Sequence, residues 1–162
     1  MATEGKNLSY YDKASIPNGA NMTIGIVVSE WNHNITNGLL EGSIAALKDN
    51  GVLEENIHVK WVPGTFELAL AAQHMFERVM VDGIVCLGSV IQGETKHFDF
   101  VCHGATQGIM NVGLKYDKPA IFGVLTDNTE QQGIDRSGGK HGNKGIECAI
   151  ACMKMIALKR SL

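Results

Sequence analysis

The sequence predicts an α/β fold: a three-layer α/β/α sandwich in which a four-stranded parallel sheet carries helices on both faces. From residue 22 onward, short apolar runs alternate with longer stretches of helical periodicity. The first of these runs is apolar at nearly every position, as expected for a strand that is buried on both faces. Strands that alternate with helices imply right-handed crossovers and therefore a parallel sheet.

The first strand is predicted from an apolar run, and the first helix from asparagines that can begin and end it. Residues 22–29 form the run that predicts the strand. Asn32 or Asn34 can cap the helix that follows, in which apolar residues recur at helical spacing. Asn50 and Gly51 can supply the left-handed residue that ends this helix.

The middle of the chain repeats the pattern twice. Residues 57–62 predict the second strand, which Pro63 and Gly64 end, and residues 66–79 predict the second helix. Residues 83–90 predict the third strand. Residues 98–116 have helical periodicity but contain three glycines, each of which weakens a helix by about 1 kcal/mol relative to alanine. We therefore expect tight packing against a neighbouring element there.

The last part of the chain supplies one more strand and two helices. Residues 120–125 predict the fourth strand, residues 130–136 a short acidic helix, and residues 143–158 a closing helix. The closing helix is apolar around much of its circumference, so we expect one face to pack on its own sheet and the other on a second copy of the chain. This order of elements is typical of the flavodoxin-like class.

The chain is divided into two parts by this scheme. Residues 22–162 form a single domain. Residues 1–21 form an N-terminal arm that has no partner in the predicted sheet, and we expect it to be a loose tail or to lie along a neighbouring copy.

Composition and charge exclude several classes of protein. The 14 basic and 17 acidic side chains give a formal charge of −3, without the basic excess of a nucleic-acid-binding protein. No window holds the ~18 apolar residues that a membrane span requires. The four cysteines form no CxxC pair, so we expect a soluble cytoplasmic protein with reduced thiols. Cys148 and Cys152 are expected to be core residues, and we predict no metal site.

The stretch that is richest in functional signals is Gly-Ser-Val-Ile-Gln-Gly-Glu-Thr-Lys-His-Phe-Asp, residues 88–99. An apolar strand ends there in a glycine-containing turn that carries His97 and opens a helix. Ligands of open parallel sheets bind at the carboxyl ends of strands, and free N–H groups at a helix start favour an anion such as phosphate. An imidazole beside such an anion can transfer protons near neutral pH.

Four blocks of the sequence carry a family pattern. They are Gly-Ile-Val-Val-Ser-Glu-Trp-Asn (25–32), Val-Pro-Gly-Thr-Phe-Glu (62–67), the stretch 87–99, and Ile-Phe-Gly-Val-Leu-Thr (121–126) followed by Asp-Arg-Ser-Gly-Gly-Lys-His-Gly-Asn-Lys-Gly (135–145). In order and spacing they resemble the lumazine synthase family of riboflavin biosynthesis. The resemblance implies a transferase that condenses 5-amino-6-(D-ribitylamino)uracil with 3,4-dihydroxy-2-butanone 4-phosphate to 6,7-dimethyl-8-ribityllumazine, the penultimate step of the pathway, releasing phosphate and water without a cofactor.

The resemblance also implies the site residues. The catalytic residues would be His97 for proton transfer, Arg136 for the phosphate, and Lys144 as a second positive charge near the phosphate. The substrate-binding residues would be Trp31, Thr65, Phe66, Glu67, Ser89, Val90, Ile91, Glu94, Thr95 and Phe122. Trp31, where the family more often has phenylalanine, would stack on the pyrimidine. Trp61 has no counterpart among the family's site residues and is expected to serve packing or an interface.

The family's sites lie between neighbouring monomers of a pentamer, so the resemblance implies a homo-oligomer in which Phe122 comes from the adjacent subunit. Some members pack twelve pentamers into an icosahedral shell of sixty subunits, which the short stretch 139–144 favours, whereas Pro17 in the arm argues against it. Association with riboflavin synthase is a further implied partnership.

The alternatives to a synthase are a non-catalytic flavin or lumazine carrier, motivated by Trp31, and a purely structural shell protein. A carrier has no use for His97 and Arg136 together.

Overall fold

A four-stranded parallel sheet forms the middle layer of the molecule, with the strand order β2-β1-β3-β4. The computed structural model describes residues 7–162. The elements are β1 (Ile24–Ser29), α1 (His33–Asp49), β2 (Ile57–Val62), α2 (Leu68–Arg78), β3 (Gly83–Ile91), α3 (His97–Tyr116), β4 (Ala120–Asp127), α4 (Glu130–Arg136), β5 (Ser137–Gly139), β6 (Gly142–Asn143) and α5 (Lys144–Ser161). Short 3₁₀ turns lie at Lys13–Ser15, Glu54–Asn56 and Thr65–Glu67.

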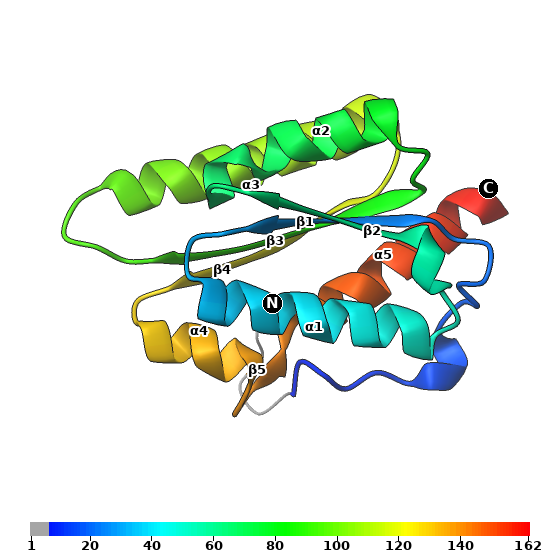
Figure 1. Ribbon diagram of the computed structural model, residues 1–162, viewed down its shortest axis with the longest axis horizontal. Coiled ribbons are helices and arrows are strands. Elements are labelled where there is room, and N and C mark those ends of the chain that lie inside the picture. The colour runs from blue at the N-terminus through cyan, green and yellow to red at the C-terminus, as the bar shows by residue number, and fades with distance from the viewer. Residues whose placement is uncertain (1–6) are drawn as a thin grey trace.

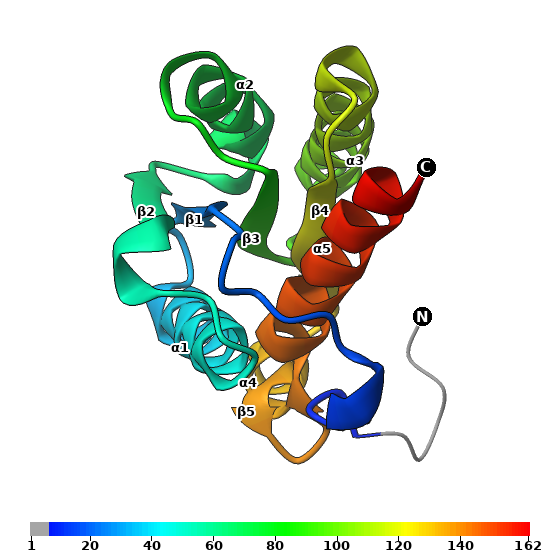
Figure 2. The same ribbon diagram turned by 90° about the vertical axis from the view of Figure 1, so that its right-hand side faces the viewer.

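Helices cover both faces of the sheet, which confirms the predicted three-layer architecture. Figures 1 and 2 show α2 and α3 on one face and α1, α4 and α5 on the other. Each face has its own apolar core. All six residues of β1 are buried, as the prediction of a strand covered on both faces requires. No helix within residues 7–162 is long and apolar enough to cross a membrane.

The predicted elements are all present, with shifts at their ends. The second helix is shorter than predicted, because its first turn is the 3₁₀ turn Thr65–Glu67. The small antiparallel hairpin of β5 and β6 was not predicted. Strands of three and two residues, made of glycine and polar side chains, carry no alternating apolar pattern that would identify them.

The glycines of α3 serve the close packing that the sequence predicts. A Cβ at Gly104 would lie 2.5 Å from the ring of Phe66, and one at Gly108 would lie 2.7 Å from the Cβ of Ala69. The helix therefore lies directly against the start of α2, at a distance that a larger side chain would prevent.

The closing helix α5 buries its cysteines, as predicted. Cys148 and Cys152 belong to the core between the sheet and α1 and α5. Burial raises the pKa of the Cys148 thiol to about 12, and that of Cys86 in β3 likewise to about 12. Such thiols stay protonated and inert at neutral pH. On its other side, α5 leaves Met155 half exposed.

The described part of the N-terminal arm, residues 7–21, lies along its own chain, and the first six residues of the predicted arm lie outside the described residues. The N–H of Leu8 donates to the carbonyl of His141 at 2.8 Å. Farther along, Ile16 packs against the core, and the N–H of Gly19 donates to the carbonyl of Asn50 at 2.8 Å. The sequence did not predict this path.

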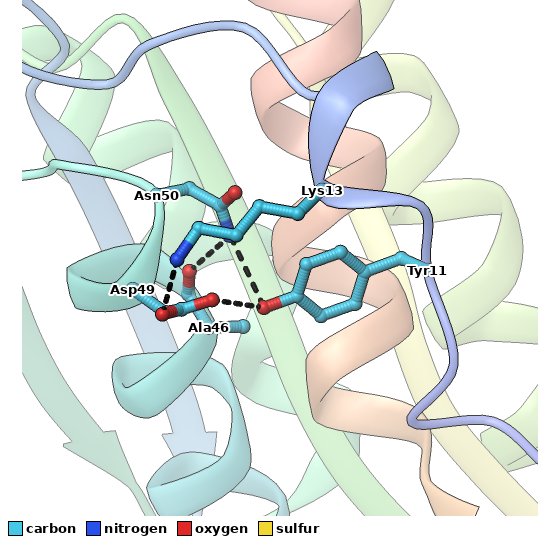
Figure 3. Close-up of polar contacts among 5 residues, drawn as sticks. All are labelled: Tyr11, Lys13, Ala46, Asp49 and Asn50. Carbon is cyan, nitrogen blue, oxygen red and sulfur yellow. Dashed lines mark hydrogen bonds and ion pairs between the residues drawn. The ribbon is translucent and has the colours of Figure 1, made fainter.

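A polar cluster holds the middle of the arm to the end of α1 (Figure 3), and we call it the arm clasp: Tyr11, Lys13, Asp49 and Asn50. Asp49 accepts from the Tyr11 hydroxyl at 2.8 Å and from the Lys13 ammonium at 2.6 Å. The bond from Lys13, then that from Tyr11, lowers the pKa of the Asp49 carboxyl. Partial burial, then the bond to Asp49, raises the pKa of Tyr11.

The arm clasp is expected to hold best between about pH 4 and pH 10. Because the pKa of Asp49 lies below its ordinary 3.8, its contribution is complete above that pH and is lost as the pH falls through the lowered pKa. Because the pKa of Tyr11 lies above its ordinary 10.0, its contribution is complete below pH 10 and is lost as the pH rises through the raised pKa. Hydrogen exchange of residues 7–21 across this range measures both limits.

A substitution tests the same cluster at pH 7. Asp49→Asn should speed exchange in residues 7–21, because Lys13 and Tyr11 then face a neutral amide. The matched control is Glu54→Gln, which removes the nearby exposed pair with Lys48 without touching the arm. Equal exchange in wild type and Asp49→Asn would show that the clasp does not hold the arm.

Candidate active site

A cavity of about 670 Å³ opens at the carboxyl ends of β1, β2 and β3. Its lining residues are Trp31, Asn32, Gly64, Thr65, Phe66, Glu67, Ser89, Val90, Ile91, His97, Phe100 and Val101. The strand order reverses direction between β1 and β3, so the cavity lies at the topological switch point where open α/β sheets bind ligands. Its size suits a small organic ligand.

The end of β1 presents an exposed indole. Trp31 follows the strand by two residues, and 73% of its surface is exposed, so it is not a core tryptophan. A Cβ at Gly64 would lie 3.5 Å from Cδ1 of Trp31 and 3.0 Å from Oε2 of Glu67. The absence of a side chain at Gly64 therefore leaves room between the indole and the carboxylate. Trp61, in β2, stacks on His33 with ring centroids 5.1 Å apart and lies outside the cavity lining, which matches its predicted packing role.

The end of β2 contributes the 3₁₀ turn Thr65–Glu67. Phe66 rests its ring against Gly104 of α3, and 60% of its surface remains exposed. Glu67 stands immediately before α2, and its side chain makes no capping hydrogen bond to that helix. The carboxylate of Glu67 is thus not used to cap α2, although a negative charge at this position also favours the helix dipole.

The ends of β2 and β3 each bring an unpaired hydroxyl to the cavity. The Oγ of Ser89 and the Oγ1 of Thr65 are buried and have no hydrogen-bond partner within residues 7–162. Buried hydroxyls without partners are uncommon in folded proteins and cost free energy. Their presence among the lining residues is typical of a site organised for a ligand rather than for stability.

His97 is the first residue of α3 and is exposed at the cavity. The residue before it, Lys96, makes no side-chain cap, and the N–H of His97 donates to the Thr95 hydroxyl at a long 3.4 Å. Glu94 and Thr95 precede the helix in an exposed loop that adjoins the cavity but is not part of its lining. A 20-residue helix whose N–H groups are poorly capped favours an anion at this end.

Besides Glu94 and Thr95, three predicted site residues do not line this cavity within one chain. Phe122, in β4, is half buried against the core beneath α2 and α3. Arg136 ends α4, and its guanidinium donates to the carbonyl of Gln132 at 3.0 Å. Lys144 begins α5 and pairs with Glu147. All three follow β3 in the chain, whereas eight other predicted residues converge on the cavity.

Burial raises the pKa of Asp127, at the end of β4, and the charge of Arg136 opposes the increase. Arg136 therefore lies near the carboxyl end of its own β4.

Four lining residues were missed by the sequence analysis: Asn32, Gly64, Phe100 and Val101. Phe100 and Val101 lie three and four residues after His97, so the helical period places them on the same face as the histidine. That spacing would have identified them. Asn32 was predicted only as a possible helix cap, which Asn34 could equally have supplied.

Comparison with known proteins gives one consistent result. The family model described as 6,7-dimethyl-8-ribityllumazine synthase matches residues 21–160. A protein of that name from Flavobacterium psychrophilum is 57% identical over 160 residues, covering 98% of this chain and 84% of its own length. The proteins of the same name from Christiangramia forsetii and Porphyromonas gingivalis are 57% and 49% identical, covering 99% of this chain and 96% and 99% of their own lengths.

The contact between Gly104 and Phe66 predicts how the cavity wall responds to a small added volume. Gly104→Ala should gain about 1 kcal/mol of helix propensity. Its Cβ would lie 2.5 Å from the Phe66 ring, and overpacking of this kind costs about 1 to 3 kcal/mol. We expect a net loss of about 1 kcal/mol in the free energy of unfolding, measured by thermal denaturation.

Gly113→Ala is the matched control in the same helix, because a Cβ there would meet its nearest atoms at 3.3 to 3.5 Å. It should leave stability unchanged or raised. A Gly104→Ala variant as stable as the Gly113→Ala variant would mean that Phe66 moves freely and is not held by α3.

Proposed function

The chain belongs to the 6,7-dimethyl-8-ribityllumazine synthase family and is a transferase of riboflavin biosynthesis, and we propose that its reaction takes place in the cavity between the ends of β1, β2 and β3. The observation that carries this proposal is the convergence of seven predicted residues from three strand ends on one cavity, together with His97 at the start of α3. The reaction joins 5-amino-6-(D-ribitylamino)uracil to 3,4-dihydroxy-2-butanone 4-phosphate, with loss of phosphate and water.

The pyrimidine substrate is bound by the strand ends. The exposed indole of Trp31 supplies a flat stacking surface, and the backbone of Ser89, Val90 and Ile91 offers donors and acceptors to the polar edge of the ring. The ribityl hydroxyls bind at the turn of Thr65, Phe66 and Glu67, where the Glu67 carboxylate is not used as a helix cap.

The phosphate binds at the start of α3, on the amides of Glu94 and Thr95, with the helix dipole favouring the dianion. The guanidinium of Arg136 supplies the bidentate donors that suit phosphate oxygens, and Lys144 adds a second positive charge. His97, beside this anion, transfers protons during imine formation, phosphate elimination and ring closure.

Arg136, Lys144 and Phe122 come from the adjacent subunit of a homo-oligomer in this proposal. Two observations support it: these residues do not line the cavity of their own chain, and α3 leaves Phe100, Met110 and Leu114 more than half exposed.

We propose a cyclic pentamer, and twelve pentamers in a sixty-subunit shell as its larger form. Native mass measurement distinguishes the pentamer from the shell. Association with riboflavin synthase stays a prediction. The four free cysteines support a cytoplasmic location.

The non-catalytic carrier is the weaker alternative, because a carrier has no need of an imidazole and a phosphate-binding arginine. The two hypotheses differ in what His97→Ala does. In the synthase, kcat should fall about 100-fold or more, since a positioned general acid–base contributes about 10² to 10⁴, while the affinity for the lumazine product is kept. Lumazine absorbance with both substrates measures turnover, and product titration measures affinity. Unchanged turnover would reject the role of His97.

A mixing experiment tests whether each site is shared by two subunits. His97→Ala and Arg136→Ala chains are each nearly inactive alone, but in randomly mixed rings roughly a quarter of the sites combine an intact His97 with an intact Arg136 from the next chain. Co-expression of the two variants should therefore restore roughly a quarter of wild-type activity. A mixture as inactive as its parents would place both residues in one subunit's site.

A further inference from the structure

Asn32 departs from the ordinary start of a helix. It precedes α1 with φ 57° and ψ 47°, in the left-handed region, and its side chain makes no capping hydrogen bond. Residues at this position are normally extended, and their side chains accept from the first turn. The other non-glycine residue with positive φ among residues 7–162 is Asp117, at the end of α3, where left-handed residues are routine. Asn32 therefore has a conformation that helix capping does not explain.

The side-chain amide of Asn32 is used across the sheet instead. Its Nδ2 donates to the carbonyl of Ser89 in β3 at 3.0 Å. The last paired residues of β1 and β3 are Val28 and Leu87, so Ser89 lies two residues beyond the ladder. The amide of Asn32 supplies the donor that β1 no longer offers once the two strands have separated.

Both ends of this bond reach the walls of the cavity. Trp31 directly precedes Asn32, so the direction of its indole depends on the left-handed turn that leads from β1 into α1. Ser89 begins the stretch Ser89–Ile91, the backbone of which borders the cavity opposite. One side chain thus joins the aromatic wall to the polar wall.

We propose that Asn32 is a positioning residue, which holds the indole of Trp31 and the backbone of Ser89–Ile91 at the spacing required by the pyrimidine between them; this rests on the proposed function. Asparagine meets both demands of the position. It tolerates the left-handed region better than most residues, and its amide donates a hydrogen bond, which neither glycine nor an ionised aspartate can do. Asn32 takes no part in proton transfer or phosphate binding.

Two substitutions separate the hydrogen bond from the backbone conformation. Asn32→Gly leaves the left-handed backbone unstrained but removes the donor. Asn32→Asp keeps the size and the tolerated backbone but turns a carboxylate oxygen toward the Ser89 carbonyl. The matched control is Asn34→Ala, which removes an amide that donates to Glu130 at 2.8 Å from the same helical turn, outside the cavity lining. Each variant is also made with Trp61→Phe, which leaves Trp31 as the one tryptophan of the chain.

The readouts are the KM of each substrate and the fluorescence anisotropy of Trp31. In Asn32→Gly, the KM for the ribitylaminouracil should rise about fivefold, the equivalent of one net hydrogen bond, and in Asn32→Asp it should rise further. The KM for the phosphate substrate should not change, because that substrate binds at α3. Trp31 anisotropy should fall in both variants, and Asn34→Ala should match wild type in every readout.

The results that overturn the proposal are distinct from those that overturn the proposed function. Unchanged KM and unchanged anisotropy in Asn32→Gly would show that Asn32 holds neither wall. A fall in kcat alone, or an equal rise in both KM values, would assign Asn32 a merely structural role. If wild type forms no lumazine, the proposed function fails, while the anisotropy of the same variants still decides whether Asn32 orients the indole.

Discussion

In the strand order β2-β1-β3-β4, the chain leaves β1 toward β2 and leaves β3 toward β4, so the two central strands separate at their carboxyl ends. Right-handed crossovers in opposite directions then place α1 on one face and α2 and α3 on the other. The cavity forms at this end of the sheet. Every lining residue lies at or just after a strand end or in the first two turns of α3.

The separation of β1 and β3 at their carboxyl ends costs free energy, which burial in the rest of the domain offsets. Strands that separate leave backbone groups without ladder partners, and the carbonyl of Ser89 accepts instead from the side chain of Asn32. The hydroxyls of Ser89 and Thr65 stay unpaired beside it. Elsewhere the two strands are buried, β1 at all six positions and β3 at its first seven. The left-handed Asn32 and these two unpaired hydroxyls lie at the site, where a functional role explains them.

Sequence patterns predicted the layers well, because periodicity follows from which face of an element is buried. They predicted the succession of strands and helices along the chain and the close packing of the glycine-containing helix α3, since a glycine inside a helix weakens it unless a neighbour needs the space. Periodicity carries no signal for the β5–β6 hairpin or for the path of residues 7–21, which depend on single hydrogen bonds such as that from Leu8 to His141. The role of Asn32 was missed for the same reason: its left-handed backbone and its bond to Ser89 join residues 57 positions apart.

Folding and catalysis place different demands on this chain. Two apolar cores, one beneath α1 and α5 and the other beneath α2 and α3, form within one copy, whereas Phe100, Met110 and Leu114 of α3 stay more than half exposed. The cavity is lined only by residues up to Val101, and Arg136 remains beside its own β4 and α4. A copy that presents its β4–α5 segment to the cavity of the next copy makes a heterologous contact, which closes on itself only as a ring. In the proposed ring, closure would thus add positive charge to the anion end of each cavity, and activity would depend on assembly.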